Sequence, residues 1–312
     1  VDMMGNTIHN WDMLERGYTM HHAISQDKQG NILATVSKTS AKIANGKDVR
    51  INDFIIMMDP EKGEILQEWD LVHMLDSARY GMTDYDLTSD PFAQSASNWA
   101  YNNGIVEWGD DYLATARYQG IFKFNKAGGI EWIISPHGYW RDKYLKLLLN
   151  PLHADGTPIT DPEVIAGTKN CDDFEWPWGC HTAVPLPNGH ILYFNNGYGR
   201  NFKLDFTDRK NIYTCGIEYE VDEVNRTVRQ VWQYGKERGA AYFTPARSGV
   251  QYLEQTGNRL ICPGMSNVLS NGNRGARVTE VDPETQDVVF ELELEDAIYQ
   301  RVYRMSLYPE NQ

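Results

Sequence analysis

Hydrophobic and polar positions alternate in short segments along most of the chain, separated by turns rich in Asp, Asn and Gly. One recurring unit is an apolar alternating run, a polar turn and a second alternating run, which is typical of a β-hairpin. Residue patterns typical of helices occur only in short segments near 70–78 and 140–150. The pattern therefore predicts an all-β protein. The hairpin unit stands at 1–11, 55–69, 121–132, 217–232 and 277–292.

A second unit precedes most of these hairpins and consists of a strand, a turn ending in Gly, and another strand. Its starting positions are separated by 79, 80 and 68 residues, and the turn Gly always lies eight residues further on. The starting positions are His22, Tyr101, His181 and Gly249, and the turn residues are Gly30, Gly109, Gly189 and Gly257.

Four antiparallel strands in each repeat are typical of the blades of a β-propeller. The hairpin at 1–11 and a strand at 302–309 are expected to complete a shared blade, which gives about five blades in one domain over 1–312. A sandwich of repeated hairpins is the structural alternative. The long insertions at 78–98 and 150–180 are candidates for function, since loops on a rigid scaffold usually carry it.

The first strand of each propeller blade lines the central channel, so equivalent positions should converge there. This predicts that His22, Tyr101 and His181 lie together. Asn103 should face the same side as Tyr101 because side chains alternate along a strand, and Arg117 lies on the next strand of that blade. Each has a structural alternative: a hydrogen-bonded core imidazole, a core aromatic ring, or an arginine paired with a surface acid. His21 should point away from its neighbour.

Composition and net charge limit the classes of function that this chain can have. The net charge of −14 disfavours a nucleic-acid partner, and no apolar run is long enough to span a bilayer. The four Cys residues match no zinc spacing. A metal site formed by histidines is an alternative, but no H-x-H or carboxylate–His spacing supports it, so no metal is predicted, and no cofactor is predicted either. Cys215 and Cys262 lie in apolar strands as buried thiols, whereas Cys171 and Cys180 flank a loop and could pair in an oxidising compartment. The sequence sets no oligomeric state, and a homo-oligomer is compatible with it.

Several motifs resemble the bacterial arylsulfate sulfotransferases that work without PAPS. They include "MHHAISQDKQGNIL", "SNWAYNNGIVEW", "LATARYQG", "CHTAVPLPNGHILYFNNGYGR" and "QVWQYGKERGAAYFTP", in order over nearly the whole chain. The resemblance implies a six-bladed propeller preceded by a small β-sandwich domain, and a periplasmic or secreted location. Compared with the family, this chain is expected to lack the β-sandwich domain and about one blade at its amino end.

The resemblance implies sulfuryl transfer from a phenolic sulfate donor to a phenol acceptor through a transiently sulfated histidine. His181 matches the family nucleophile, His22 matches the second His of the "HH" motif, and Arg117 matches the arginine of "S-R-x-Q". Cys180 stands where the family usually has Gln. The planar, positively charged guanidinium of Arg117 suits the sulfuryl oxygens. His22 is the expected proton donor and acceptor for the phenolic oxygen.

The family motif W-x-H-x-N corresponds to Trp99, Tyr101 and Asn103, so a tyrosine replaces the family histidine. Tyrosine can donate a hydrogen bond to a sulfuryl oxygen but cannot carry a positive charge. We expect this replacement to weaken sulfate binding or to change substrate choice. The residues expected to form flat apolar walls for an aryl group, with caps over the propeller as the alternative, are Trp99, Tyr118, Phe174, Trp176 and Trp178.

Two other functions fit the same side chains. A binding propeller without catalysis is suggested by Tyr101 and by the missing amino-terminal part. A polysaccharide lyase is the less favoured enzyme class, with Tyr101 and His181 for β-elimination and Arg117 for a uronate carboxylate. Fold alone does not decide among them.

Overall fold

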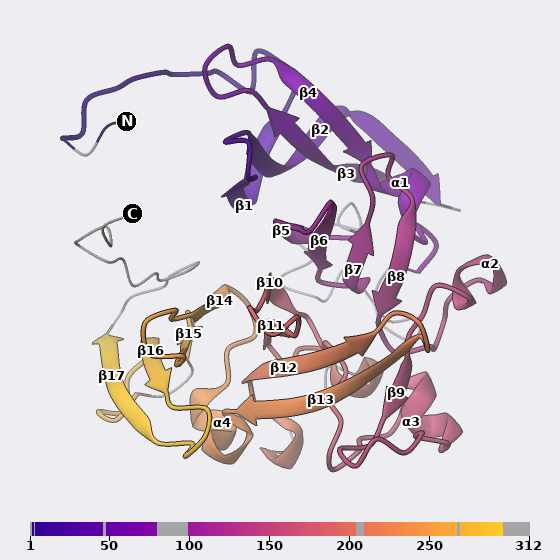
Figure 1. Cartoon of the computed structure of the whole chain (residues 1–312), viewed down its shortest axis with the longest axis vertical. Helices are drawn as coiled ribbons and strands as arrows, with labels where there is room; N and C mark the ends of the chain where they lie inside the picture. The colour runs from indigo at the N-terminus through magenta and orange to yellow at the C-terminus, as the bar shows by residue number, and fades with distance from the viewer. Residues whose placement is uncertain are drawn as a thin grey trace.

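Four small antiparallel sheets are arranged as the blades of a β-propeller in the computed structural model of this protein (Figure 1). The structure describes residues 2, 4–45, 48–79, 99–203, 209–266 and 269–295. The predicted all-β propeller is therefore confirmed, with four blades formed by the described residues.

Each blade is a meander of four strands in chain order. The first blade contains β1 (Thr19–Gln26), β2 (Ile32–Asn45), β3 (Asp48–Met58) and β4 (Ile65–Asp70). The second contains β5 (Asn102–Trp108), β6 (Asp111–Ala116), β7 (Gly120–Phe124) and β8 (Ile130–Ile134). The third contains β10 (His181–Pro185), β11 (Ile191–Asn195), β12 (Cys215–Asp222) and β13 (Thr227–Tyr234), with the short β9 (Asn150–Leu152) parallel to β13. The fourth contains β14 (Ser248–Tyr252), β15 (Arg259–Pro263), β16 (Gly275–Val281) and β17 (Val288–Glu295).

Helices are short and lie between strands. The two helix-like segments read from the sequence coincide with α1 and α2. The helical segments are α1 (Leu71–Met74), α2 (Asp142–Leu145), α3 (Pro162–Ala166), α4 (Gly239–Tyr242) and the 3-10 turns η2 (Arg200–Phe202), η3 (Arg209–Asn211) and η4 (Lys236–Arg238). No helix among the described residues is both long enough and apolar enough to cross a membrane.

The turn glycines of the repeat have the backbone conformation that the repeat requires. Gly30, Gly109, Gly189 and Gly257 have φ angles of 87°, 67°, 84° and 75°, in the region where side chains other than hydrogen are disfavoured. Each lies in the turn after the innermost strand of its blade, two residues before the return strand begins. The regular spacing of these glycines in the sequence is thus the spacing of the first hairpin in each blade.

The predicted shared blade is not found in this form. Strands begin only at Thr19 within the described amino-terminal residues, so the hairpin expected at 1–11 is wrong. The Asp2 side chain accepts hydrogen bonds from the Met4 and Asn6 amides, and this local turn replaces strand pairing. The strand expected at 302–309 and most of the insertion at 78–98 lie outside the described residues.

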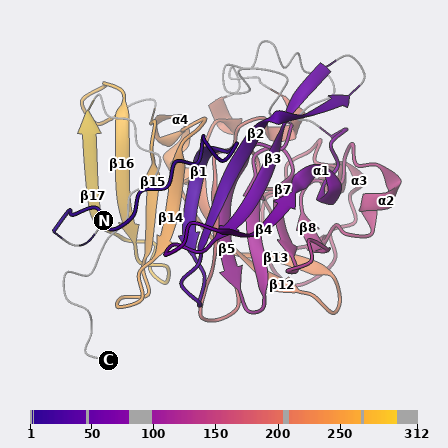
Figure 2. The ribbon, with the colours of Figure 1, turned by 90° about the horizontal axis from the view of Figure 1, so that it is seen from above.

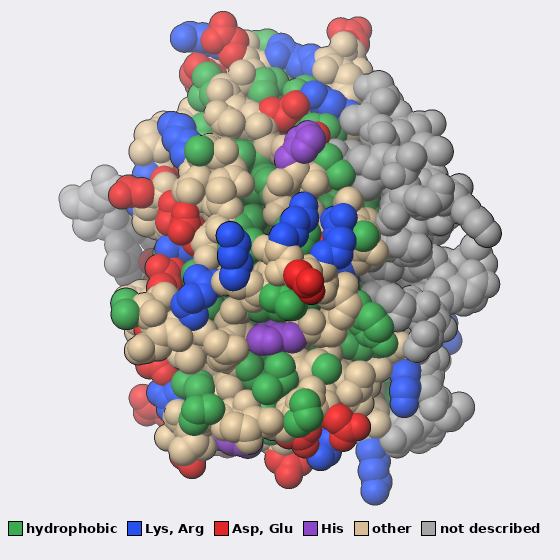
Figure 3. Space-filling model, turned by 90° about the vertical axis from the view of Figure 1, so that its right-hand side faces the viewer, with side chains coloured by type: hydrophobic (Ala, Val, Ile, Leu, Met, Phe, Trp, Pro, Cys, Tyr) green, Lys and Arg blue, Asp and Glu red, His purple; other side chains and the backbone are tan. Residues whose placement is uncertain are grey.

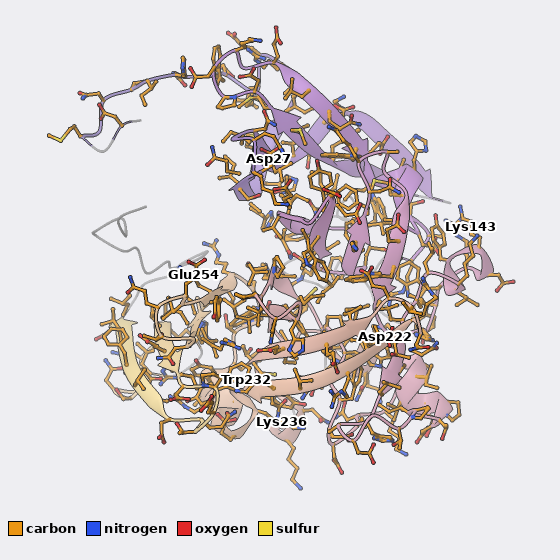
Figure 4. All side chains as sticks on the ribbon, in the orientation of Figure 1. Asp27, Lys143, Asp222, Trp232, Lys236 and Glu254 are labelled. Atoms are coloured by element: carbon orange, nitrogen blue, oxygen red, sulfur yellow. The ribbon has the colours of Figure 1, made fainter. Side chains whose placement is uncertain are left out.

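The strands of the sheets stand side by side when the molecule is seen from above (Figure 2). Large side chains lie between neighbouring sheets (Figure 4). Between the first two blades, the Trp69 ring packs against Tyr112 and Phe124, with ring centroids 4.9 Å and 5.4 Å apart. Tyr193 and Tyr219, on adjacent strands of the third blade, lie in the cluster that joins it to the second. The wedge-shaped gaps are therefore closed by aromatic residues, which fixes the inner strands relative to one another.

Lys and Arg side chains gather on the outer wall seen in Figure 3 although the chain is acidic overall. Arg141, Lys143 and Lys146 are exposed there, in and around α2, and Lys143 is labelled in Figure 4. These three residues belong to the segment between β8 and β9 and not to the innermost strands.

Candidate functional site

The innermost strands meet at the centre of the propeller, where β1 lies against β5, β5 against β10, and β10 against β14. The ring centroid of His22 is 4.8 Å from that of Tyr101 and 6.4 Å from that of His181. Three positions of equal phase in the sequence repeat therefore come together from three blades, as the repeat predicts.

Irregular backbone at the same point of the first three blades places these side chains. The register of the first strand pair shifts around His22, at Asn103 and at Thr182. His22, Tyr101 and Thr182 have positive φ angles of 54°, 55° and 47°, a conformation that residues with a Cβ seldom adopt. Bulges of this kind redirect side chains next to active sites, and strained residues cluster at functional sites.

His181 is held as one tautomer. Its Nδ1 lies 2.6 Å from Oδ1 of Asn196, and Nδ2 of Asn196 donates to the carbonyl of Thr244 at 2.9 Å. That second hydrogen bond fixes the orientation of the amide, so Oδ1 must accept and Nδ1 of His181 must carry the proton. Nε2 is then the ring nitrogen with a lone pair.

Both imidazoles in the site are kept neutral. Burial, followed by the positive charge of Arg117, lowers the pKa of His181 from 6.5 to about 3. Burial also lowers the pKa of His22, with further contributions from His21, Arg117 and Arg247. His22 is more exposed than His181. At neutral pH the site therefore holds two uncharged imidazoles beside a permanent cation.

Stability should depend on pH through His181. As pH falls through 6.5 the unfolded chain binds a proton there, while the folded chain does so only near pH 3. We expect this one histidine to remove about 2 kcal/mol of unfolding free energy between pH 7 and pH 5. Urea denaturation at both pH values should show a smaller loss for His181→Gln than for the unaltered protein. His190→Gln, a histidine outside the channel, is the control, and an equal loss in all three proteins would contradict the prediction.

Arg117 is the cation at the centre of the site, and only 3% of its surface is exposed. Its Nη2 donates to the carbonyl of Pro245 at 2.8 Å, and its guanidinium carbon lies 4.4 Å from the Tyr198 ring centroid and 5.9 Å from that of Tyr101. A guanidinium held between aromatic rings keeps a fixed orientation. It can present a planar fork to an anion that enters the site.

Asn103 links two blades. Its Nδ2 donates to the carbonyl of Cys180 at 2.8 Å, and its Oδ1 accepts from the Thr115 hydroxyl at 2.6 Å. This contact places the amide beside the residue that precedes His181. One of the two N–H bonds of Asn103 is thereby used within the protein, which the sequence did not indicate.

The expected aromatic walls divide into two groups. Tyr118 and Trp178 line a cavity next to Arg117. Phe174 and Trp176 instead pack in the core between blades, with their ring centroids 4.8 Å apart, and Trp99 is fully buried in another core cluster. These three rings lie in core clusters and are not among the residues that line the cavity next to Arg117.

Two further expectations need correction. His21 does not point away from the site, since its Nδ1 lies 3.0 Å from Nδ1 of His22 and its Nε2 lies 3.7 Å from the Asp53 carboxylate. All four Cys residues are free thiols in the structure, so the pairing considered for Cys171 and Cys180 is absent. Burial raises the pKa of the Cys180 thiol to about 12, which keeps it neutral beside His181.

Sequence reasoning missed two residues of the site. Asn196 lies in "NNGYGR" directly after β11, and an Asn before Gly reads as a turn residue, so no local signal gave it a contact with His181. Arg247 precedes β14 with a φ of 59° and is exposed. Its charge contributes to lowering the pKa of His22. In the fourth blade, the loop that contains Arg247 contributes to the site, and Gly249 does not.

Comparison with known proteins gives consistent matches. The model of the family described as Arylsulfotransferase (ASST) matches residues 1–304. The chain is 28% identical to "Arylsulfate sulfotransferase AssT" of Escherichia coli O6:H1 (strain CFT073) and 29% identical to the protein of the same name from Lelliottia amnigena. Each alignment covers 98% of this chain and 56% of the relative, so the chain spans about half the length of these relatives.

A solved structure from Bacteroides uniformis, provisionally described as a 6-phosphogluconolactonase, matches with a TM-score of 0.37 and 12% identity. The match covers 92% of this chain and 77% of that one. A similarity this low carries no argument about function.

Proposed function

The chain belongs to the arylsulfotransferase (ASST) family, and we propose that it moves a sulfuryl group from a phenolic sulfate ester to another phenol through a sulfated His181. The observation that carries this proposal is the neutral, buried imidazole whose Nδ1 proton is held by Asn196. A neutral imidazole with one lone-pair nitrogen is a nucleophile that can also leave, which divides one difficult transfer into two steps.

In the first step, Nε2 of His181 forms a bond to sulfur as the bond between sulfur and the donor's phenolic oxygen breaks. The electron pair leaves with the phenolate oxygen, which His22 stabilises by a hydrogen bond. In the second step, the acceptor phenol attacks sulfur, its proton passes to His22, and the bond between Nε2 and sulfur breaks. The ring of His22, 6.4 Å from that of His181 between centroids, is close enough for both roles.

Negative charge on the sulfuryl oxygens needs fixed donors. Arg117 offers a buried guanidinium, Tyr101 a phenolic hydroxyl, and Asn103 an amide N–H. Arg247 adds a second positive charge, which can attract an anionic donor. The proposal requires no PAPS, and it includes the periplasmic or secreted location implied by the family resemblance.

Tyr101 supports one competing function, a propeller that binds sulfate esters without turnover. A tyrosine cannot provide the charge of the family histidine at this position. Binding of an aryl sulfate with no release of phenol would favour this alternative.

The test uses the full chain with p-nitrophenyl sulfate as donor and a second phenol as acceptor. We expect nitrophenolate release that depends on the acceptor, and kinetics in which donor and acceptor react in separate steps. The absence of release by the folded protein would overturn the transferase proposal for simple aryl sulfates and leave the binding alternative.

Asn196 should act through His181. We expect Asn196→Ala to lower kcat for sulfuryl transfer by about 100-fold with little change in donor KM, because the imidazole loses its fixed tautomer. Asn196→Asp, which retains an acceptor, should recover much of the rate and move the acid limb of the pH profile upward, since a carboxylate favours the protonated imidazole. An equal rate for the alanine and unaltered proteins would show that this hydrogen bond does not position His181.

A further inference from the structure

A cluster of three possible metal ligands lies outside the channel, on the insertion before His181. Nδ1 of His153 is 3.0 Å from one Asp173 carboxylate oxygen, and Sγ of Cys171 is 3.1 Å from the same oxygen. All three ligand atoms lie within 4.8 Å of one another. Residue spacing did not indicate this cluster, because His153 and Cys171 lie on opposite sides of α3 in the chain.

We propose that His153, Cys171 and Asp173 bind one divalent transition-metal ion, Zn²⁺ in preference to a hard cation such as Mg²⁺. Thiolate, imidazole and carboxylate together are the ligand types that Zn²⁺ takes. Ligands at ordinary Zn–N and Zn–S lengths around a tetrahedral ion lie roughly 3.2–3.7 Å apart. The observed separations differ from these by only small side-chain movements.

The contacts among these three side chains agree with their use as a metal site. Asp173 is the shared acceptor for His153 and Cys171, so these donors already converge on one point. The Ala154 amide donates to the other Asp173 oxygen at 2.9 Å and orients the carboxylate from behind. Such outer contacts commonly hold metal ligands in place.

In this cluster the Cys171 thiol donates its proton to the Asp173 carboxylate. That proton would be released as the sulfur–metal bond forms, so metal affinity should increase with pH.

The surroundings leave room for an ion and a fourth ligand. The side chains of His153 and Asp173 are 40% and 35% exposed. A water molecule can complete the shell. Arg229 donates to the Ala154 carbonyl at 3.0 Å and is paired with Glu220, so its charge is already neutralised by a carboxylate.

The site would join the two ends of the segment from 153 to 173, which contains α3. His153 follows β9, and Asp173 immediately precedes the core residues that lead to β10 and His181. A metal there closes a loop in the folded state and stabilises it in proportion to its occupancy. This role does not depend on the proposed sulfuryl transfer.

The experiment titrates the metal-stripped full chain with Co²⁺, whose bond to a thiolate gives a charge-transfer absorption band, and then displaces it with Zn²⁺. We expect one Co²⁺ per chain, loss of the band in Cys171→Ser, and affinity at least about 100-fold weaker in His153→Gln. His190→Gln is the matched control, because His190 also contacts a carboxylate, Glu218 at 2.7 Å, without a nearby thiol ligand. Zn²⁺ should raise the Tm of the unaltered protein and of this control only.

Two results would overturn the proposal: no charge-transfer band in the folded protein, or binding that is unchanged in both ligand variants, which means an adventitious ion only. Melting curves without metal establish that each variant is folded. If Cys171→Ser does not fold, His153→Gln and its effect on Co²⁺ affinity decide the question.

Discussion

Replacing His181 with alanine is expected to abolish acceptor-dependent release of nitrophenolate from p-nitrophenyl sulfate. Loss of a nucleophile removes the covalent route, and we expect kcat/KM to fall on the order of 10⁴-fold or more. The remaining groups, Arg117 and Tyr101, would still bind the sulfate ester. Donor binding should therefore survive in the variant while turnover does not.

The same experiment can identify the intermediate. The unaltered protein, quenched after mixing with donor alone, should carry one sulfuryl group on the peptide that contains His181. His190→Ala, on the same blade but outside the channel, should retain both the labelled peptide and the activity. Activity without any labelled peptide, and kinetics in which both substrates bind before reaction, would make His181 a general base and contradict a sulfated intermediate.

Much of the fold could be predicted because the repeat depends on local sequence signals. A turn Gly eight residues after each innermost position, and alternating runs on both sides, defined the first hairpin of all four blades. The failure at 1–11 has a local cause, since the Asp2 side chain captures backbone amides that a hairpin needs. Alternation alone does not reveal that competition.

The centre of the site was also predictable, because equal phase in a repeat becomes a common position in a propeller. His22, Tyr101 and His181 follow from that rule, and their rings meet in the structure. Asn196 and Arg247 could not be found in this way. They lie on loops after or before strands, and their contacts with the site depend on how neighbouring blades pack.

The sequence could not show which aromatic residues lie in the core and which face the cavity. Phe174, Trp176 and Trp178 look alike in the sequence, yet only Trp178 reaches the cavity beside Arg117. Trp176 donates its indole N–H to the Val164 carbonyl at 2.8 Å and stays in the core. Whether an aromatic ring covers the core or faces a ligand is decided by tertiary packing, which sequence proximity to a functional residue does not report.

Arg117 is expected to show the second large effect, and two substitutions can separate its charge from its shape. Arg117→Ala removes the buried cation that faces the sulfuryl oxygens, and kcat/KM should fall by about 10²- to 10³-fold. Arg117→Lys keeps a positive charge but loses the planar fork that matches a sulfate edge. We expect it to remain slow, within about tenfold of the alanine variant.

The pH profile distinguishes the two variants further. After burial, the charge of Arg117 is the main factor that lowers the pKa of His181. Removing it should raise that pKa, so more of the imidazole is protonated in weak acid and the acid limb of the rate profile moves to higher pH. Arg117→Lys should leave the limb near its original position, because a cation remains.

Arg277→Lys is the matched control for a buried arginine outside the site. Arg277 is 5% exposed, its Nε donates to the Glu293 carboxylate at 2.8 Å, and its Nη1 donates to the Ala241 carbonyl at 3.2 Å. We expect this variant to lower the Tm while leaving the acid limb unchanged. If Arg117→Ala moved neither the rate nor the acid limb beyond the control, Arg117 would be a structural residue, and the sulfuryl oxygens would have to be bound by another group, with the exposed Arg247 as the next to test.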